Sequence, residues 1–292
     1  MLAVSWTAIL LSSCIAVIFW RTFTPGEPEW WPWLHFIGLA LLFALTCIRT
    51  SLKPLRSFLF VLLVIFGLGY GGGWKWGLIQ FIITSPVGNF LKTQTPLSIG
   101  LHLLRLLPAA VILTFFLMKG RKRAEFFLIK GDVRALVVPS KLLGMKKAEP
   151  WTRIGSIFSV IFTSGGFIFL LLRSNKGSIA DSMDLFVTVP VAVLIAGINA
   201  FNEEFTLRAA PLSEIWQVLG KQQALLITTI YFGIGHYYGV PNGVIGVFLS
   251  AFLGWFLGKS LMETKGFFWA WFIHVLQDIV IFTFYAVFPA MP

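Results

Sequence analysis

The chain consists of long apolar runs separated by short polar segments. Such runs, of roughly 17 to 25 residues, have the length that an α-helix needs to cross the hydrocarbon core of a bilayer. We predict spans at 2–20, 33–48, 57–70, 97–118, 154–172, 183–202, 222–239, 242–260 and 267–288. The pattern therefore predicts an all-α protein, a polytopic membrane bundle of about eight transmembrane helices.

One segment, 71–93, does not fit this pattern. It combines a run of three glycines with Lys75, Pro86 and Asn89 around a short apolar stretch. We expect it to be interfacial or re-entrant rather than spanning.

Composition supports the membrane class. Hydrophobic residues make up 57% of the chain and charged residues 12%, and the mean hydropathy is +0.84. Both cysteines, Cys14 and Cys47, fall in predicted spans, so the sequence supports neither a disulfide framework nor a thiolate metal site.

Most of the net charge of +11 comes from one loop, 119–153, with ten Lys or Arg residues against three acidic ones. Basic loops beside spans mark the cytoplasmic side, so we expect this loop to be cytoplasmic and to contact anionic membrane lipids rather than nucleic acid. A second basic cluster, 49–56, lies on the same side of the membrane as this loop only if the chain crosses the membrane an even number of times between the cluster and the loop. The Arg173–Asp184 loop would then lie outside, and the next span would return Glu203 toward the cytoplasmic half.

Ionisable side chains concentrate in the last part of the chain, within or beside apolar runs. A charge in hydrocarbon is costly, so such groups are candidates for function. We therefore divide the chain into 1–153, apolar spans plus the basic loop, and 154–292, which carries the candidate chemistry. The candidates form three motifs with partners four residues apart: Glu203-Glu204-x-x-x-Arg208, Phe232-x-x-x-His236 and His274-x-x-x-Asp278.

On a helix, Glu204 and Arg208 share a face and can form an ion pair, which leaves Glu203 free to act as a general base. The simpler alternative places both glutamates at a helix end near water, and a lone histidine such as His236 is most often a core residue. With His274, these groups suffice for peptide hydrolysis by an activated water. Glu203, His236 and His274 are also zinc ligands by type, although the HExxH spacing is absent.

In this order and spacing, the three motifs resemble those of the CPBP family of intramembrane proteases, which includes the type II CAAX prenyl endopeptidases and Abi-like proteins. The resemblance implies an integral membrane endopeptidase of a bacterial inner (plasma) membrane, with a cavity open to the cytoplasm. Its substrate would be a prenylated or otherwise membrane-anchored protein or peptide, cut near the C-terminus. The resemblance leaves open whether the enzyme uses a glutamate or a metal.

By matching positions, the resemblance implies that Glu203 and His236 activate the water and that His274 and Asp278 form the oxyanion site. Glu204 with Arg208 would support the first glutamate. Asp278 stands where the prenyl endopeptidases have Asn, and an ionised Asp cannot donate a hydrogen bond to an oxyanion. Asp278 must therefore be protonated there, or orient His274 instead.

Two other classes of function remain open. A proton-coupled transporter could use the same groups as a relay, although we find no internal repeat. A non-catalytic scaffold, chaperone or immunity-type protein could keep the fold without turnover. Depth is a further constraint: a helix from Lys221 puts His236 about 22 Å along its axis, whereas Glu203 is expected in the cytoplasmic half.

Overall fold

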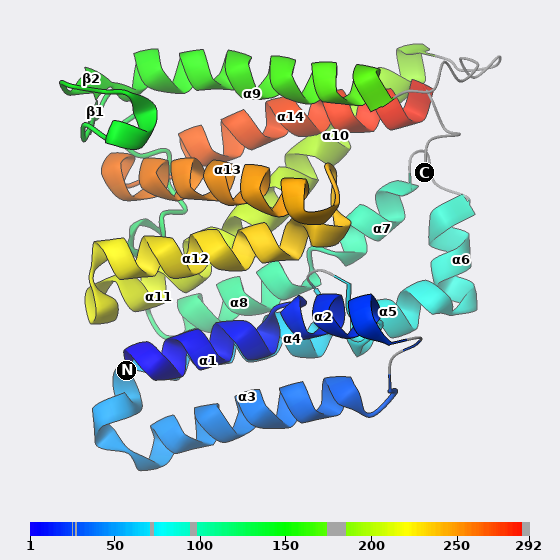
Figure 1. Cartoon of the computed structure of the whole chain (residues 1–292), viewed down its shortest axis with the longest axis vertical. Helices are drawn as coiled ribbons and strands as arrows, with labels where there is room; N and C mark the ends of the chain where they lie inside the picture. Colours follow the sequence, from blue (N-terminus) through cyan, green and yellow to red (C-terminus); the bar gives the residue numbers. More distant parts are fainter. Residues whose placement is uncertain (25, 27, 71–72, 94–97, 174–184, 288–292) are drawn as a thin grey trace.

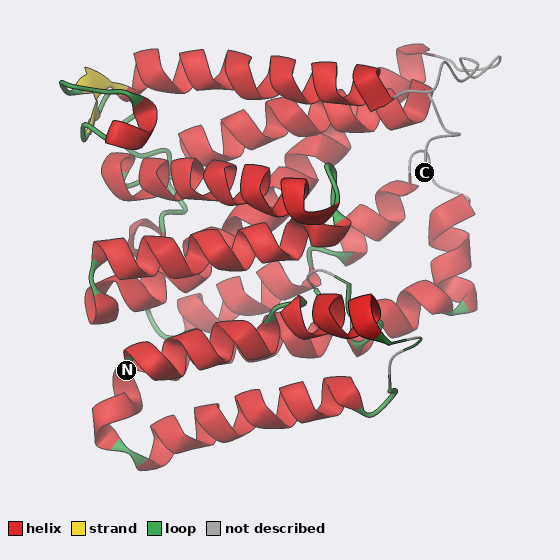
Figure 2. Cartoon of the chain, in the orientation of Figure 1, coloured by secondary structure: helices red, strands yellow, loops and turns green. Residues whose placement is uncertain are grey.

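The structure is a computed structural model that describes residues 1–24, 26, 28–70, 73–93, 98–173 and 185–287. It is almost entirely helical (Figure 2). Within the described residues, seven helical segments are long and apolar enough to cross a membrane, or eight if a bent N-terminal pair counts as one span. The predicted all-α polytopic bundle is confirmed.

Most predicted spans coincide with observed helices, which lie roughly parallel to one another (Figure 1). They are α3 (Trp31–Ile48), α4 (Arg56–Leu68) preceded by the 3₁₀-helix η1 (Thr50–Leu55), α7 (Ile99–Leu104) followed by α8 (Leu107–Met118), α9 (Trp151–Arg173), α13 (Gly243–Thr264) and α14 (Phe268–Val287).

The first predicted span is broken in two. Helices α1 (Leu2–Ser12) and α2 (Ile15–Phe23) meet at an angle of 53°. At the break, the hydroxyls of Ser12 and Ser13 donate hydrogen bonds to the carbonyls of Ile9 and Leu10, three residues back. Such back-bonding competes with the helical ladder and bends helices.

The segment 71–93 contains two short helices, α5 (Gly77–Thr84) and α6 (Pro86–Thr93), with residues 71–72 outside the described part. At eight residues each, they extend only about 12 Å and cannot cross a bilayer. The expectation that this segment does not span is confirmed. Consistently, the two basic clusters meet at one end of the bundle, where Lys119 Nζ donates a hydrogen bond to Ser57 Oγ at 2.6 Å.

The prediction of a span ending at residue 202 is wrong. Helix α10 (Leu185–Glu203) continues through a π-helical turn, η5 (Glu204–Ala209), into α11 (Ala210–Leu219), and α12 (Lys221–Gly235) then returns. The charges at 203–208 lower the local hydropathy but do not end the helix. Glu203 therefore lies 16 residues, about 24 Å, from the turn at Leu219, and His236 lies about 22 Å from Lys221. The two residues are at similar depth, which resolves the expected mismatch.

The basic loop is folded onto the junction of α13 and α14. It contains the 3₁₀-helices η3 (Arg123–Phe126) and η4 (Lys141–Leu143) and the two-residue antiparallel strands β1 (Leu136–Val137) and β2 (Glu149–Pro150). Glu263, near the end of α13, accepts hydrogen bonds from the Trp151 indole at 3.0 Å and the Val138 amide at 3.2 Å. The loop from Arg173 to Asp184 lies outside the described residues from position 174 on.

Helices α12 and α13 pack closely because small residues face each other. A Cβ atom added to Gly233 would lie 2.7 Å from Ala251 Cβ and 2.9 Å from the Val247 carbonyl oxygen. Small residues let transmembrane helices approach to this distance, where van der Waals contact stabilises the pair.

We expect Gly233→Ala to lower the midpoint of thermal unfolding in detergent, because overpacking a tight interface costs about 1–3 kcal/mol. Gly235→Ala is the matched control, since nothing lies within 4 Å of the Cβ that it would add. Equal midpoints for the two variants would contradict this account of the interface.

Candidate active site

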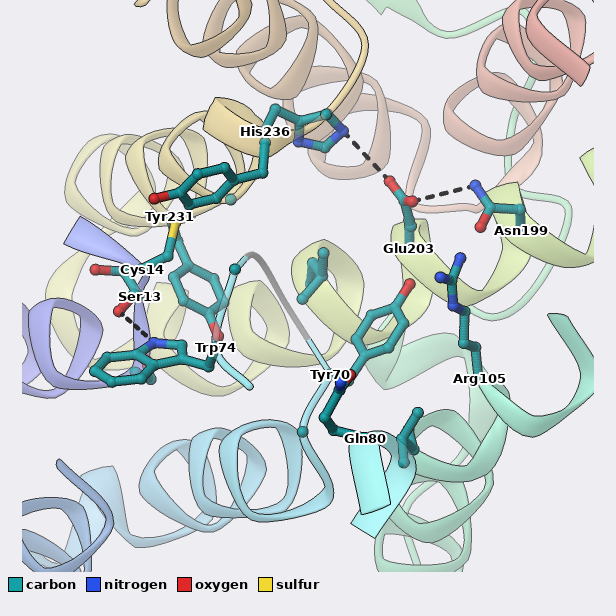
Figure 3. Close-up of a pocket in the computed structure, with 18 of the residues that line it drawn as sticks. Ser13, Cys14, Tyr70, Trp74, Gln80, Arg105, Asn199, Glu203, Tyr231 and His236 are labelled. Atoms are coloured by element: carbon teal, nitrogen blue, oxygen red, sulfur yellow. Dashed lines mark hydrogen bonds and ion pairs between the residues drawn. The ribbon is translucent and has the colours of Figure 1, made fainter. Parts of the chain in front are cut away.

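The three motifs converge on one site. Glu203 ends α10, His236 follows α12 in the short 3₁₀-helix η6 (His236–Tyr238), and His274 and Asp278 lie one turn apart on α14. Glu203 Oε2 lies 3.6 Å from His236 Nε2 and 3.8 Å from His274 Nε2. Figure 3 shows the Glu203 carboxylate between His236 and Asn199. All six predicted site residues therefore lie in one cluster.

Glu204 and Arg208 form the buried base of this cluster. Both side chains are 0% exposed and form an ion pair within the π-helical turn. The second Glu204 oxygen, Oε1, accepts a hydrogen bond from His274 Nδ1 at 2.7 Å. Glu204 was expected to hold Glu203 in position. It instead accepts a hydrogen bond from the imidazole of His274 on α14.

Phe232, the aromatic residue that begins the second motif, contacts both Arg208 and His236. The Arg208 guanidinium lies 4.1 Å from the centre of its ring, within the range of a cation–π interaction. The same ring lies 4.2 Å from the imidazole of His236, measured between centroids. On α13, Gly254 leaves room for this stack, since its Cβ would lie 3.2 Å from Phe232.

Asn199 is a site residue that the motifs did not reveal. Its Nδ2 atom donates hydrogen bonds to Glu203 Oε1 at 3.1 Å and to Asp278 Oδ2 at 3.0 Å. It thereby links the two carboxylates that face the same imidazole. The available signal was a polar residue one helical turn before Glu203 in an otherwise apolar run.

The two consecutive glutamates have different environments. The Glu204 side chain is 0% exposed, whereas that of Glu203 is 19% exposed and reaches a cavity. Single π-helical turns inside α-helices are rare and occur frequently at functional sites, and this one begins between the two residues. Glu204 is committed to its ion pair, while Glu203 Oε2 has no hydrogen-bond partner among the described residues.

The hydrogen bonds of the histidines fix which ring nitrogens face Glu203. His236 Nδ1 lies 2.9 Å from the Phe232 carbonyl oxygen, which can only accept, so Nδ1 carries the proton. In the neutral ring, His236 Nε2 is then a hydrogen-bond acceptor. His274 Nδ1 is directed in the same way to Glu204, so His274 Nε2 faces Glu203 and, at 3.7 Å, Asp278.

A cavity of about 320 Å³ adjoins the exposed side of Glu203. Both parts of the chain line it, so residues before 154 contribute to the site although sequence reasoning assigned all the chemistry to 154–292. The lining includes Ser13, Cys14, Tyr70, Trp74, Gln80 and Arg105 from the first part, and Asn199, Glu203, Tyr231 and His236 from the second (Figure 3).

The cavity lies far from the basic loop. Glu203, His236 and Tyr70 are about 24, 22 and 21 Å along their helices from the ends at the basic face. The cavity-lining residues that directly follow α4 and α12 lie at the ends of these helices that are distant from the basic loop (Figure 1). The cavity-lining residues and the basic loop therefore lie toward opposite ends of the bundle.

Zinc was the alternative that the sequence left open for this site. Zinc would require Glu203, His236 and His274 to point at one ion. Among the described residues, no group of three or more His, Cys, Asp or Glu side chains is placed to hold a metal ion. No step below is routed through a metal.

Comparison with known protein families identifies a similarity. The family model described as Type II CAAX prenyl endopeptidase Rce1-like matches the part of the chain that carries all three motifs. The match covers residues 184–280, so this part of the chain is similar to the Rce1-like family. The predicted resemblance is confirmed, and the Rce1-like family is a protease family with membrane-embedded members, as the helices of this chain require. No curated protein and no solved structure matches the chain.

The buried ion pair gives a stability prediction. We expect Arg208→Met to lower the free energy of unfolding by about 3–5 kcal/mol, because it leaves the Glu204 carboxylate buried without a counter-charge. The double variant Glu204→Gln, Arg208→Met should recover part of this loss, because the remaining amide is neutral and can still accept from His274. Thermal unfolding in detergent measures both, and a double variant less stable than Arg208→Met would contradict the assignment.

Proposed function

We propose that this protein is an intramembrane endopeptidase that hydrolyses a peptide bond with a water activated by Glu203 and His236. The observation that carries the proposal is the pair of acceptors, Glu203 Oε2 and His236 Nε2, 3.6 Å apart on two residues that line the cavity. At this separation one water molecule can hydrogen-bond both atoms. The Rce1-like match supports peptide-bond chemistry at the level of the family.

In the first step, the water oxygen attacks the carbonyl carbon of the scissile peptide bond and a water proton passes to Glu203. His236 orients the water by accepting its second hydrogen bond. The attack forms a tetrahedral intermediate with a negatively charged oxygen. His274 Nε2, when protonated, is the donor that faces this region and can stabilise that oxygen.

In the second step, Glu203 returns the proton to the leaving nitrogen, the C–N bond breaks, and a carboxylate and an amine are released. Asn199 keeps Glu203 and Asp278 in place through its two hydrogen bonds. In this scheme Asp278 orients His274 and does not donate to the oxyanion. Asn199, Glu204 and Asp278 are thus positioning residues.

We further propose that the basic loop 119–153 is cytoplasmic, in the inner membrane of a bacterium. Its ten basic residues against three acidic ones support this orientation. The substrate, a membrane-anchored protein or peptide, then reaches the cavity from the extracytoplasmic side. A prenyl anchor, which is added in the cytosol, is less compatible with this entry than other lipid or transmembrane anchors.

Substitution of the proposed base tests the chemistry. We expect Glu203→Gln to lower kcat for cleavage of a membrane-tethered peptide library by roughly 10²- to 10⁴-fold, because a general base contributes about that much. Purified protein is assayed by mass spectrometry of the products, with and without a strong chelator. Glu29→Gln, the same change at an exposed position, is the control.

Each alternative has its own outcome in this assay. Cleavage that survives in Glu203→Gln would contradict the mechanism, and loss of wild-type cleavage in chelator would show that a metal is required. If well-folded wild-type protein cleaves no peptide, the scaffold, chaperone or immunity-type interpretation is favoured. A transporter would instead move protons in liposomes without cleaving peptide.

Cysteine labelling tests the orientation. In a variant with Cys14 and Cys47 replaced by Ala, we introduce Lys75→Cys on the cavity side or Lys146→Cys in the basic loop, both at exposed positions. We expect a membrane-impermeant maleimide to label the Lys75→Cys variant in intact cells and the Lys146→Cys variant only after permeabilisation. The reverse pattern would show that the cavity faces the cytoplasm.

A further inference from the structure

Arg105 is a charge in the cavity that the proposed chemistry does not use. It lies between α7 and α8, within a segment apolar enough to span the membrane, and its side chain lines the cavity that contains Glu203. A cation at such a position is costly and marks a functional site by default. Arg208, the cation of the second motif, cannot take its place because it is 0% exposed.

No protein partner of the Arg105 guanidinium is found in the described part of the chain. None of its side-chain hydrogen bonds or ion pairs falls among those of the described residues, and Glu203 Oε1 accepts its hydrogen bond from Asn199. Figure 3 shows the guanidinium and the hydroxyl of Tyr70 directed toward the same part of the cavity, below Glu203. Tyr70 lies within electrostatic range of both Arg105 and Glu203.

Two further donors complete this part of the wall. The Tyr70 hydroxyl is neutral at physiological pH and can donate one hydrogen bond, and the Gln80 amide can donate two. Gln80 lines the same cavity from α5. A guanidinium with neutral donors beside it matches a planar anion with two oxygens, which Arg binds through two parallel hydrogen bonds.

We propose that Arg105 and Tyr70 form a subsite for the C-terminal carboxylate of the peptide substrate. The inference rests on the proposed peptidase function. A cavity of about 320 Å³ is at the small end for a binding pocket and holds only a short length of chain. With the scissile bond at Glu203 and a carboxylate at Arg105, the chain end lies within the cavity. The subsite thus makes the enzyme measure a short distance from the C-terminus.

The test compares one cleavable membrane-tethered peptide, without Asp or Glu near its end, as the C-terminal acid and as the C-terminal amide. The readout is the ratio of kcat/KM for the acid to that for the amide. We expect a ratio of about 10 to 100 for the wild type, since a hydrogen-bonded charge contributes about that factor. Arg105→Gln should bring the ratio close to one, mainly through KM for the acid.

Three other variants sharpen the result. Arg105→Lys keeps the charge without the planar fork and should give an intermediate ratio. Tyr70→Phe should lower the ratio by a smaller factor and keeps the test open if Arg105→Gln does not fold. Lys75→Gln removes a positive charge at an exposed position nearby and should leave the ratio at the wild-type value.

The outcomes separate this proposal from the function on which it rests. If the wild type cleaves acid and amide equally, the subsite is refuted while the peptidase stands. If Arg105→Gln slows both peptides by the same factor, Arg105 acts as a general counter-charge of the site and the subsite is also refuted. If no peptide is cleaved by any folded variant, the peptidase function itself fails.

Discussion

A charge that cannot leave the membrane interior must be paired, and the ion pair between Glu204 and Arg208 organises the structure around that constraint. Both side chains are fully buried, so each needs partners from neighbouring helices. Glu204 takes His274 from α14, Arg208 stacks on Phe232 from α12, and Gly254 on α13 leaves space for the stack. One pair on the π-helical turn therefore fixes the positions of three other helices. The conformation of the site follows from the neutralisation of this charge and not from apolar packing alone.

The same turn separates stability from chemistry in two adjacent residues. Both oxygens of Glu204 are engaged, by Arg208 and by His274. Glu203 lines the cavity. One of its oxygens accepts a hydrogen bond from Asn199, and the other has no hydrogen-bond partner among the described residues. A general base needs this combination, because it must be held in position and yet have an acceptor lone pair free for water. Exposure of 19% for Glu203 and 21% for His236 also leaves both groups accessible to substrate.

Hydropathy predicts the helical class and most spans, and the motifs select the six site residues, but only the folded chain shows that these residues converge. Hydropathy fails between 203 and 219, because a hydropathy pattern counts each charge as a helix boundary and cannot show that two charges neutralise each other. Asn199 was missed for a similar reason: its role depends on Asp278, 79 residues away in sequence, and no local pattern records that contact. The contribution of Tyr70 could not be predicted either, since only the folded chain brings the end of α4 beside α10.

The family match covers one part of the cavity lining and leaves the other part outside. The match includes residues 184–280, which contain the residues proposed to activate water and to stabilise the oxyanion. The opposite wall comes from residues before 106, outside the match, and it carries Arg105, the one Lys or Arg among the described residues that line the cavity. The match therefore supports the proposed chemistry at the level of the family. The proposed carboxylate subsite, Arg105 and Tyr70, lies outside the matched part. Its role in substrate choice therefore has to be tested on the residues of this chain.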